Sequence, residues 1–147
     1  MYKRILVPLD GSGLAENALK HVDILTSTYK VKELIFLQVI EPAAGLIYNL
    51  EIAIQERIEK EIKDYLEGVA DTFRKRGINA RSVVAYGNAA DRILNYAEQN
   101  DVQIIIMSTH GRSGISRFFS GSVAERVIRH STIPVLILPP PGVRTSK

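Results

Sequence analysis

The sequence contains no cysteine, which excludes a disulfide framework and any metal site built on thiolates. No apolar run approaches the ~20 residues of a membrane-spanning helix, and the apolar run at the N-terminus is too short for a signal peptide. The sequence also has little excess of one charge over the other, since 19 Lys+Arg and 16 Asp+Glu give a formal net charge of +3. The basic residues are spread along the chain, which argues against a nucleic-acid surface. We therefore expect a cytoplasmic protein with neither a nucleic-acid nor a membrane partner.

The composition is that of an ordinary globular protein, with 46% hydrophobic and 24% charged residues in a chain of 147. This length is enough to bury a real core and fits one domain over residues 1–147. We find no internal repeat and no low-complexity linker that would divide the chain.

Five apolar runs are predicted to be β-strands. Their composition is apolar throughout instead of alternating, as in "QIIIM" and "PVLIL", which is typical of strands covered on both faces in a parallel sheet. The predicted strands are Arg4–Leu9, Leu34–Ile40, Ala80–Ala85, Val102–Met107 and Pro134–Leu138.

Segments with helical periodicity separate these runs. The third helix has Asn88 as its N-cap, and Gly77 closes the second helix. The alternation predicts an α/β protein, a three-layer doubly wound sandwich of a five-stranded parallel sheet and four helices. The pattern leaves the strand order open, but doubly wound sheets bind ligands beyond the carboxyl ends of their strands. One apolar stripe along the second helix is interpreted as core packing, and its residues are Ile54, Ile58, Ile62, Tyr65, Val69 and Phe73.

The connection between the fourth strand and the fourth helix, from Ser108 to about Phe119, is the longest candidate for a binding loop. It is roughly twice the ~2–6 residues usual for such a connection. It contains Gly111 and Gly114 and ends in Gly121-Ser122. Glycines let backbone amides approach an anion, and a helix N-terminus adds free N–H groups and a favourable dipole. The loop therefore has the character of a phosphate site.

Several familiar motifs are absent. No G-x-x-x-x-G-K-[ST] and no G-x-S-x-G occur, and Gly11-x-Gly13 is followed by Glu16 where a dinucleotide fingerprint requires glycine. A phospho-receiver is excluded because Pro139 occupies the position of its lysine. No third group is placed to orient His110 as a base, so we expect no catalytic residue.

The stretches "RILVPLDGS", "THGRSG" and "SGSVAERVIRHSTIPVLILP" closely resemble the universal stress protein family, and the similarity covers essentially the whole chain. ATP-binding members of that family carry G-x2-G-x9-G-[ST] after the fourth strand. Here the frame reads Ser108-x2-Gly111-x9-Gly121-Ser122, which matches three of the four motif positions. The resemblance implies the strand order 3-2-1-4-5 and an ATP-binding site.

The resemblance also implies how the ligand would be held. Asp10 would meet the adenine and ribose, Val39 and Met107 would form apolar walls, and the glycines and Ser122 would hold the phosphates. Mg²⁺ or Mn²⁺ would bridge phosphate oxygens, because no all-protein metal site is visible. The complete set of expected binding residues is Pro8, Asp10, Val39, Met107, Ser108, His110, Gly111, Gly114, Gly121, Ser122 and Val123.

Several of these residues have structural alternatives. Ser122-x-x-Glu125 is also a capping box that would open the fourth helix, and Asp10 could simply cap the first helix. Serine at 108 would be strained if the family's glycine needs a positive φ, but would fit if that glycine is needed only for its small size.

The resemblance implies an ATP-binding, nucleotide-responsive regulator of the stress response that is not an enzyme. The alternative is a family member that binds no nucleotide and acts as a dimeric protein-interaction module. In either case the family's strand order leaves Pro134–Leu138 with a free edge, which would pair with the same strand of a second copy. The irregular stretch "EPAAGLIYNLE" (residues 41–51) could be a lid, a partner surface or part of a substrate pocket.

Overall fold

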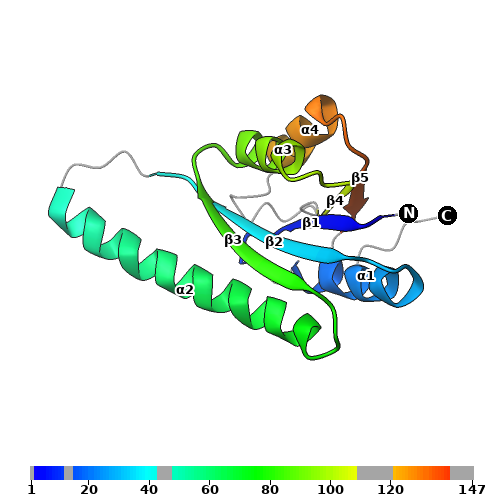
Figure 1. Ribbon diagram of the computed structural model, residues 1–147. Coiled ribbons are helices and arrows are strands. Elements are labelled where there is room, and N and C mark those ends of the chain that lie inside the picture. Colours follow the sequence, from blue (N-terminus) through cyan, green and yellow to red (C-terminus); the bar gives the residue numbers. More distant parts are fainter. Residues whose placement is uncertain (1, 12–14, 43–47, 109–120, 140–147) are drawn as a thin grey trace.

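The chain forms a parallel sheet of five strands in the computed structural model, which describes residues 2–11, 15–42, 48–108 and 121–139 (Figure 1). The strands lie in the order β3-β2-β1-β4-β5, and every neighbouring pair is parallel. This confirms the predicted α/β class and the order 3-2-1-4-5. The strands are β1 (Arg4–Pro8), β2 (Glu33–Ile40), β3 (Ala80–Tyr86), β4 (Ile104–Ser108) and β5 (Val135–Leu138).

Helices cover both faces of this sheet (Figure 1). Helices α1 (Ala15–Thr28) and α2 (Tyr48–Arg74) pack on one face, and α3 (Ala89–Gln99) and α4 (Gly121–His130) pack on the other. No helix in the described ranges is long and apolar enough to cross a membrane.

Alternate side chains of each inner strand enter two separate cores. On β2, Leu34 and Phe36 contribute to the core under α1 and α2, whereas Ile35 and Leu37 contribute to the core under α3 and α4. All four are fully buried, because strand side chains alternate between faces and both faces are covered. This explains why the strand sequences are apolar throughout.

The predicted ends of the elements are close to the observed ones. The strand ends differ by one or two residues from the prediction. Asn88 is confirmed as the N-cap of α3, because its side chain accepts a hydrogen bond from the backbone N–H of Asp91 at 3.1 Å. Gly77 is confirmed as the residue that closes α2, with φ at +81° and its N–H bonded to the carbonyl of Arg74 at 2.9 Å.

Helix α2 is longer than predicted. It begins at Tyr48, so the last four residues of the stretch 41–51 are helical and not irregular. Its 27 residues span about 40 Å, whereas the eight residues of β2 span about 26 Å. The N-terminal half of α2 consequently extends beyond the carboxyl edge of the sheet (Figure 1).

The interpretation of the whole apolar stripe of α2 as core packing is wrong for Ile54, Ile58 and Tyr65, whereas Ile62 packs against the core. Ile54 and Ile58 are 49% and 43% exposed, and Tyr65 is also exposed. The stripe packs on the sheet only where the sheet lies beneath it, down to the buried Phe73. The overhang of α2 is the physical reason, since periodicity is the same along a helix whether or not a neighbour covers it.

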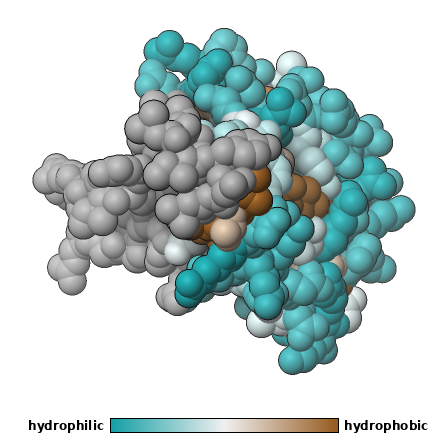
Figure 2. Space-filling view, turned by 90° about the vertical axis from the view of Figure 1, so that its left-hand side faces the viewer, coloured by the Kyte–Doolittle hydropathy of each residue, from teal (hydrophilic) through white to brown (hydrophobic). Residues whose placement is uncertain are grey.

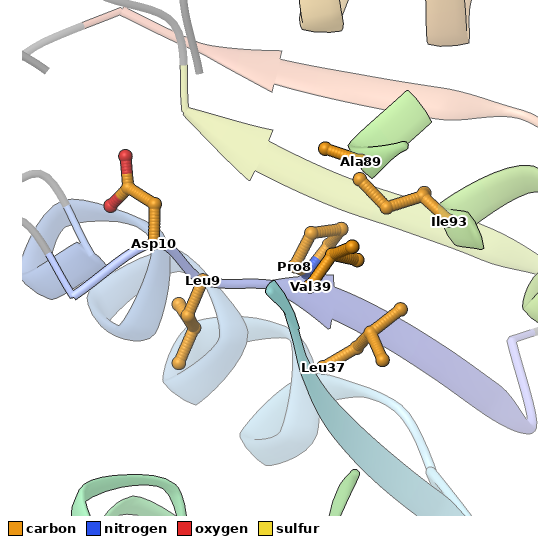
Figure 3. A pocket seen from close by; sticks show the side chains of 7 residues that line it. All are labelled: Pro8, Leu9, Asp10, Leu37, Val39, Ala89 and Ile93. Carbon is orange, nitrogen blue, oxygen red and sulfur yellow. The ribbon is translucent and has the colours of Figure 1, made fainter. Parts of the chain in front are cut away.

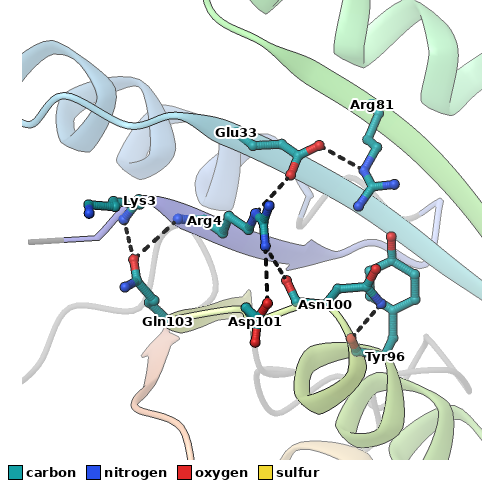
Figure 4. A network of polar contacts seen from close by, with 8 residues as sticks. All are labelled: Lys3, Arg4, Glu33, Arg81, Tyr96, Asn100, Asp101 and Gln103. Carbon is teal, nitrogen blue, oxygen red and sulfur yellow. Dashed lines mark hydrogen bonds and ion pairs between the residues drawn. The ribbon is translucent and has the colours of Figure 1, made fainter.

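A network of polar contacts holds the opposite, amino edge of the sheet (Figure 4). The Arg4 side chain lies 3.3 Å from the carboxylate of Glu33, which also pairs with Arg81 at 2.9 Å. Arg4 also donates to the carbonyl of Asn100 at 3.2 Å and contacts Asp101 at 3.5 Å. These contacts join β3, β2 and β1 to the turn between α3 and β4. They lie at the amino edge of the sheet, opposite the carboxyl edge from which the connections leave the strands.

Candidate functional site

The topological switch point of the sheet lies between β1 and β4. From β1 the chain crosses to β2 on one side, and from β3 it returns to β4 on the other side of β1. Connections that diverge in this way leave a crevice at the carboxyl ends of the two strands, where doubly wound domains bind their ligands. Leu9 makes the last contact with β2, from its N–H to the carbonyl of Leu37 at 2.8 Å. Gly11, with φ at +77°, then turns the chain away from the sheet toward α1.

A small pocket opens beside this point (Figure 3). Its lining is apolar except for one carboxylate, that of Asp10, which points to the opposite side of the chain from the Leu9 side chain. Figure 2, which faces this edge, shows apolar surface near the centre of the view, beside hydrophilic surface. The lining comes from the ends of β1 and β2 and from the first turns of α3, and consists of Pro8, Leu9, Asp10, Leu37, Val39, Ala89 and Ile93.

Three of the expected binding residues, Pro8, Asp10 and Val39, line this pocket together. Met107 does not line it and is fully buried in the core that Val39 also joins. Val123, on α4, packs against the same core. The structure thus gathers the expected base-contacting residues around one core, but brings only part of them to the pocket surface.

The remaining expected residues belong to the connection after β4. His110, Gly111 and Gly114 lie outside the described residues. Helix α4 begins at Gly121, so Gly121 and Ser122 provide backbone N–H groups of its first turn, and such groups have no partner within a helix.

The capping box expected at Ser122 is wrong in register. Ser122 is the second residue of α4 and not the residue before it, because the helix begins at Gly121. The carboxylate of Glu125, which the box would direct back toward Ser122, instead lies 2.7 Å from the guanidinium of Arg129 one turn later.

Ser108 is the last residue of β4, where it pairs in register with Leu138 of β5. It is only 6% exposed. Among the described non-glycine residues, only Asp101 has a positive φ, at 52°. Ser108 is therefore not in the left-handed region, so the serine carries no strain from a positive φ.

Sequence reasoning missed four residues of the pocket. These residues lie near the carboxyl ends of β1 and β2 or in the first turns of α3, and they are Leu9, Leu37, Ala89 and Ile93. The signal that could have found Ala89 and Ile93 is the turn that brings α3 back over the sheet after Asn88.

A fifth residue was overlooked beside the switch point. Gln38 is 8% exposed, and within the described ranges its Oε1 is a buried side-chain oxygen without a hydrogen-bond partner. It stands out in the sequence as the one polar residue inside the apolar strand "LIFLQVI".

The described part of the chain contains no group of three His, Asp or Glu side chains that could hold a metal ion.

The strand order and the pocket beside the switch point define a Rossmann-type, doubly wound α/β protein. Comparison with known proteins assigns it further. The sequence profile of the universal stress protein family matches residues 1–139, and the chain belongs to this family.

Two characterised relatives illustrate the similarity. Universal stress protein MJ0577 of Methanocaldococcus jannaschii is 33% identical over 155 aligned residues, which cover 94% of this chain and 95% of the relative. Universal stress protein YxiE of Bacillus subtilis is 32% identical over 148 residues, which cover 94% of this chain and 99% of the relative. The similarity thus extends over nearly the full length of both relatives.

Solved structures agree with this assignment. The structure of MJ0577 superposes with a TM-score of 0.83 at 32% identity and covers 99% of both chains. A universal stress protein from Archaeoglobus fulgidus in complex with dAMP has a TM-score of 0.65 at 23% identity, covering 92% of this chain and 97% of that one. A universal stress protein in complex with cAMP has a TM-score of 0.68 at 21% identity, covering 95% and 98%. The fold is common to all of them.

Proposed function

We propose that this protein binds ATP at the carboxyl edge of its sheet and acts in the cytoplasm as a nucleotide-responsive regulator of the stress response. The observation that carries the proposal is the pocket at the ends of β1 and β2, apolar except for Asp10. Proteins of the same fold hold dAMP and cAMP. We infer a nucleotide for this chain from its own residues.

The pocket suits the base and ribose better than the phosphates. The described residues line only a small hollow, far below the ~300–1,000 Å³ of sites that enclose a whole small molecule, so it would take one part of a nucleotide. Pro8 and Val39 offer apolar surface to a flat ring. The carboxylate of Asp10 accepts hydrogen bonds and repels phosphate, so it would meet a ribose hydroxyl or an amino group.

The phosphates would lie toward the start of α4. The first turn of a helix attracts anions through its free N–H groups and its dipole, and α4 begins at Gly121 and Ser122. The glycine spacing of the preceding connection matches the family motif from Gly111 onward. Mg²⁺ or Mn²⁺ would complete its shell with phosphate oxygens. No side chain is proposed as a catalyst, so the protein would bind ATP and respond to it without being an enzyme.

The test is calorimetric titration of ATP with Mg²⁺ into the wild type and into Gly121→Val, after bound nucleotide has been removed by unfolding and refolding. Valine at the first residue of α4 should block the close approach of a phosphate, so micromolar binding by the wild type should be lost. Gly68→Val is the matched control, because Gly68 lies on α2 with nothing within 4 Å of its added Cβ. It should bind as the wild type does, and circular dichroism should show that both variants fold.

A wild type that binds no ATP under these conditions would refute the proposal. The protein would then be the alternative, a dimeric interaction module that has no nucleotide.

We also propose that the protein is a homodimer through β5. This strand lies at the edge of the sheet, and a free edge invites pairing with another strand. Pro134 directs its carbonyl to β4, where Ile105 donates to it at 3.0 Å. Because peptide directions alternate along a strand, Val135 and Ile137 direct their N–H groups outward.

Light scattering at low micromolar concentration should give twice the chain mass of 16.4 kDa. Ile137→Pro removes an outward N–H and should lower the measured mass toward that of a monomer. A wild-type monomer would contradict the proposal.

A further inference from the structure

Glu41 brings a second carboxylate to the rim of the pocket. It follows β2 two residues after Val39, so the alternation of the strand directs both toward the face that α3 covers. Its Oε1 accepts a hydrogen bond from the backbone N–H of Ala89 at 3.3 Å. Ala89 lines the pocket, and so does Val39. The carboxylate is therefore held at the edge of the pocket by the start of α3.

Glu41 is not needed to cap α3, because Asn88 already does so through the N–H of Asp91. A carboxylate at this end of a helix is favoured by the helix dipole, which helps to hold it in one place. An ionised carboxylate offers about four acceptor sites and no donor. The contact with Ala89 uses one of these sites, so the group keeps the capacity to accept from a ligand in the pocket.

We propose that Glu41 is a specificity-determining residue that selects a purine with an amino group at C6 and rejects one with a keto oxygen there. This inference rests on the proposed function, in which the pocket receives the base. An amino group at C6 can donate a hydrogen bond to the carboxylate. A keto oxygen there would face the carboxylate acceptor to acceptor, and two desolvated acceptors without a hydrogen bond are costly. The rim is open to water, so we expect a preference of about tenfold, at the low end of the range for such mismatches.

The experiment compares ATP with inosine triphosphate, which carries a keto oxygen in place of the C6 amino group. Calorimetry measures both affinities, each with Mg²⁺, for the wild type, Glu41→Gln and Asn88→Ala. Glutamine keeps the length of the side chain and an oxygen for the Ala89 N–H, but its amide can donate to a keto oxygen. We expect the preference for ATP to fall from about tenfold to about twofold or less in Glu41→Gln, chiefly through tighter binding of inosine triphosphate.

Asn88→Ala separates recognition from support of the helix. It removes the other cap of α3 and should lower the melting temperature without changing the ratio of the two affinities. A ratio that changes equally in Asn88→Ala and Glu41→Gln would mean that Glu41 only supports the helix, and would overturn the inference.

The remaining outcomes separate this inference from the proposed function. If the wild type binds ATP and Glu41→Gln leaves the ratio unchanged, the inference is wrong and nucleotide binding stands. If the wild type binds neither nucleotide, the proposed function is wrong and Glu41 has no base to select.

Discussion

Replacing Ser108 by glycine tests whether the serine in the first motif position is a defect. Glycine is the residue that the ATP-binding motif has there, so a strained serine would make Ser108→Gly more stable and a better binder. Ser108 lies in β4 without a positive φ and is 6% exposed. We expect the opposite sign, because glycine in a strand loses more conformational entropy on folding.

The magnitude follows from the backbone. Glycine in the interior of a strand costs about 0.5–1 kcal/mol. For a chain of 147 residues each kcal/mol lowers the melting temperature by about 2–4 °C. Ser108→Gly should therefore melt about 1–4 °C below the wild type, and its affinity for ATP should stay within about threefold.

Gly11→Ala is the control for true backbone strain. Gly11 has φ at +77°, and the nearest atom to an added Cβ is 3.9 Å away, so any loss of stability there comes from the backbone alone. An alanine at such a φ costs about 1–2 kcal/mol. Thermal melts and urea titrations followed by circular dichroism measure both variants. A Ser108→Gly variant that melts above the wild type would refute the reasoning.

Three further predictions follow from burial and charge. Leu66→Ala should lower the free energy of unfolding by about 2–5 kcal/mol in urea titrations, because Leu66 is fully buried. Ile58→Ala should lower it by less than about 1 kcal/mol, because that side chain is 43% exposed. Equal losses of stability would mean that Ile58 is covered. A hydrogen bond to the Glu59 carboxylate raises the pKa of Tyr86 to about 12, so the stability from this bond is complete below pH ~10 and is lost as the pH rises toward 12. A phenolate absorbance titration should show the high pKa in the wild type and not in Glu59→Gln. Gln38→Met should leave stability unchanged or raise it by up to about 1 kcal/mol, because it removes a buried oxygen that has no partner among the described residues; a loss above about 1 kcal/mol would contradict this.

The sheet could be predicted from the sequence because its signal is local. A run such as "LIFL" is apolar on both faces only if both faces are covered, which predicts helices on each side and parallel strands. The strand order has no such local signal. It came from the resemblance to a family, since the pattern of runs is compatible with more than one doubly wound order.

The overhang of α2 and the composition of the pocket could not be predicted from local patterns. The apolar periodicity at Ile54 and Ile58 is the same as at Phe73, and only the length of the sheet beneath decides which of them is buried. The pocket joins Pro8, Val39 and Ile93, which are far apart in the sequence and meet because β1 and β2 end and α3 begins at one edge. Periodicity identifies the face of an element, and tertiary structure decides what that face meets.

The charges around the proposed site define a direction for a bound nucleotide. Asp10 lines the pocket and Glu41 is anchored at its rim, so two carboxylates stand at the end that would receive the base. A phosphate placed there would meet like charge, whereas the first turn of α4, at Gly121 and Ser122, presents backbone N–H groups and the positive end of a dipole. Electrostatics would thus favour one orientation of the ligand, with its base near the carboxylates and its phosphates near the start of α4. On this view the carboxylates do not weaken the binding of an anionic nucleotide, because they contact its base end, which is neutral and carries donors. They also disfavour the reversed orientation, in which the phosphates would lie beside them.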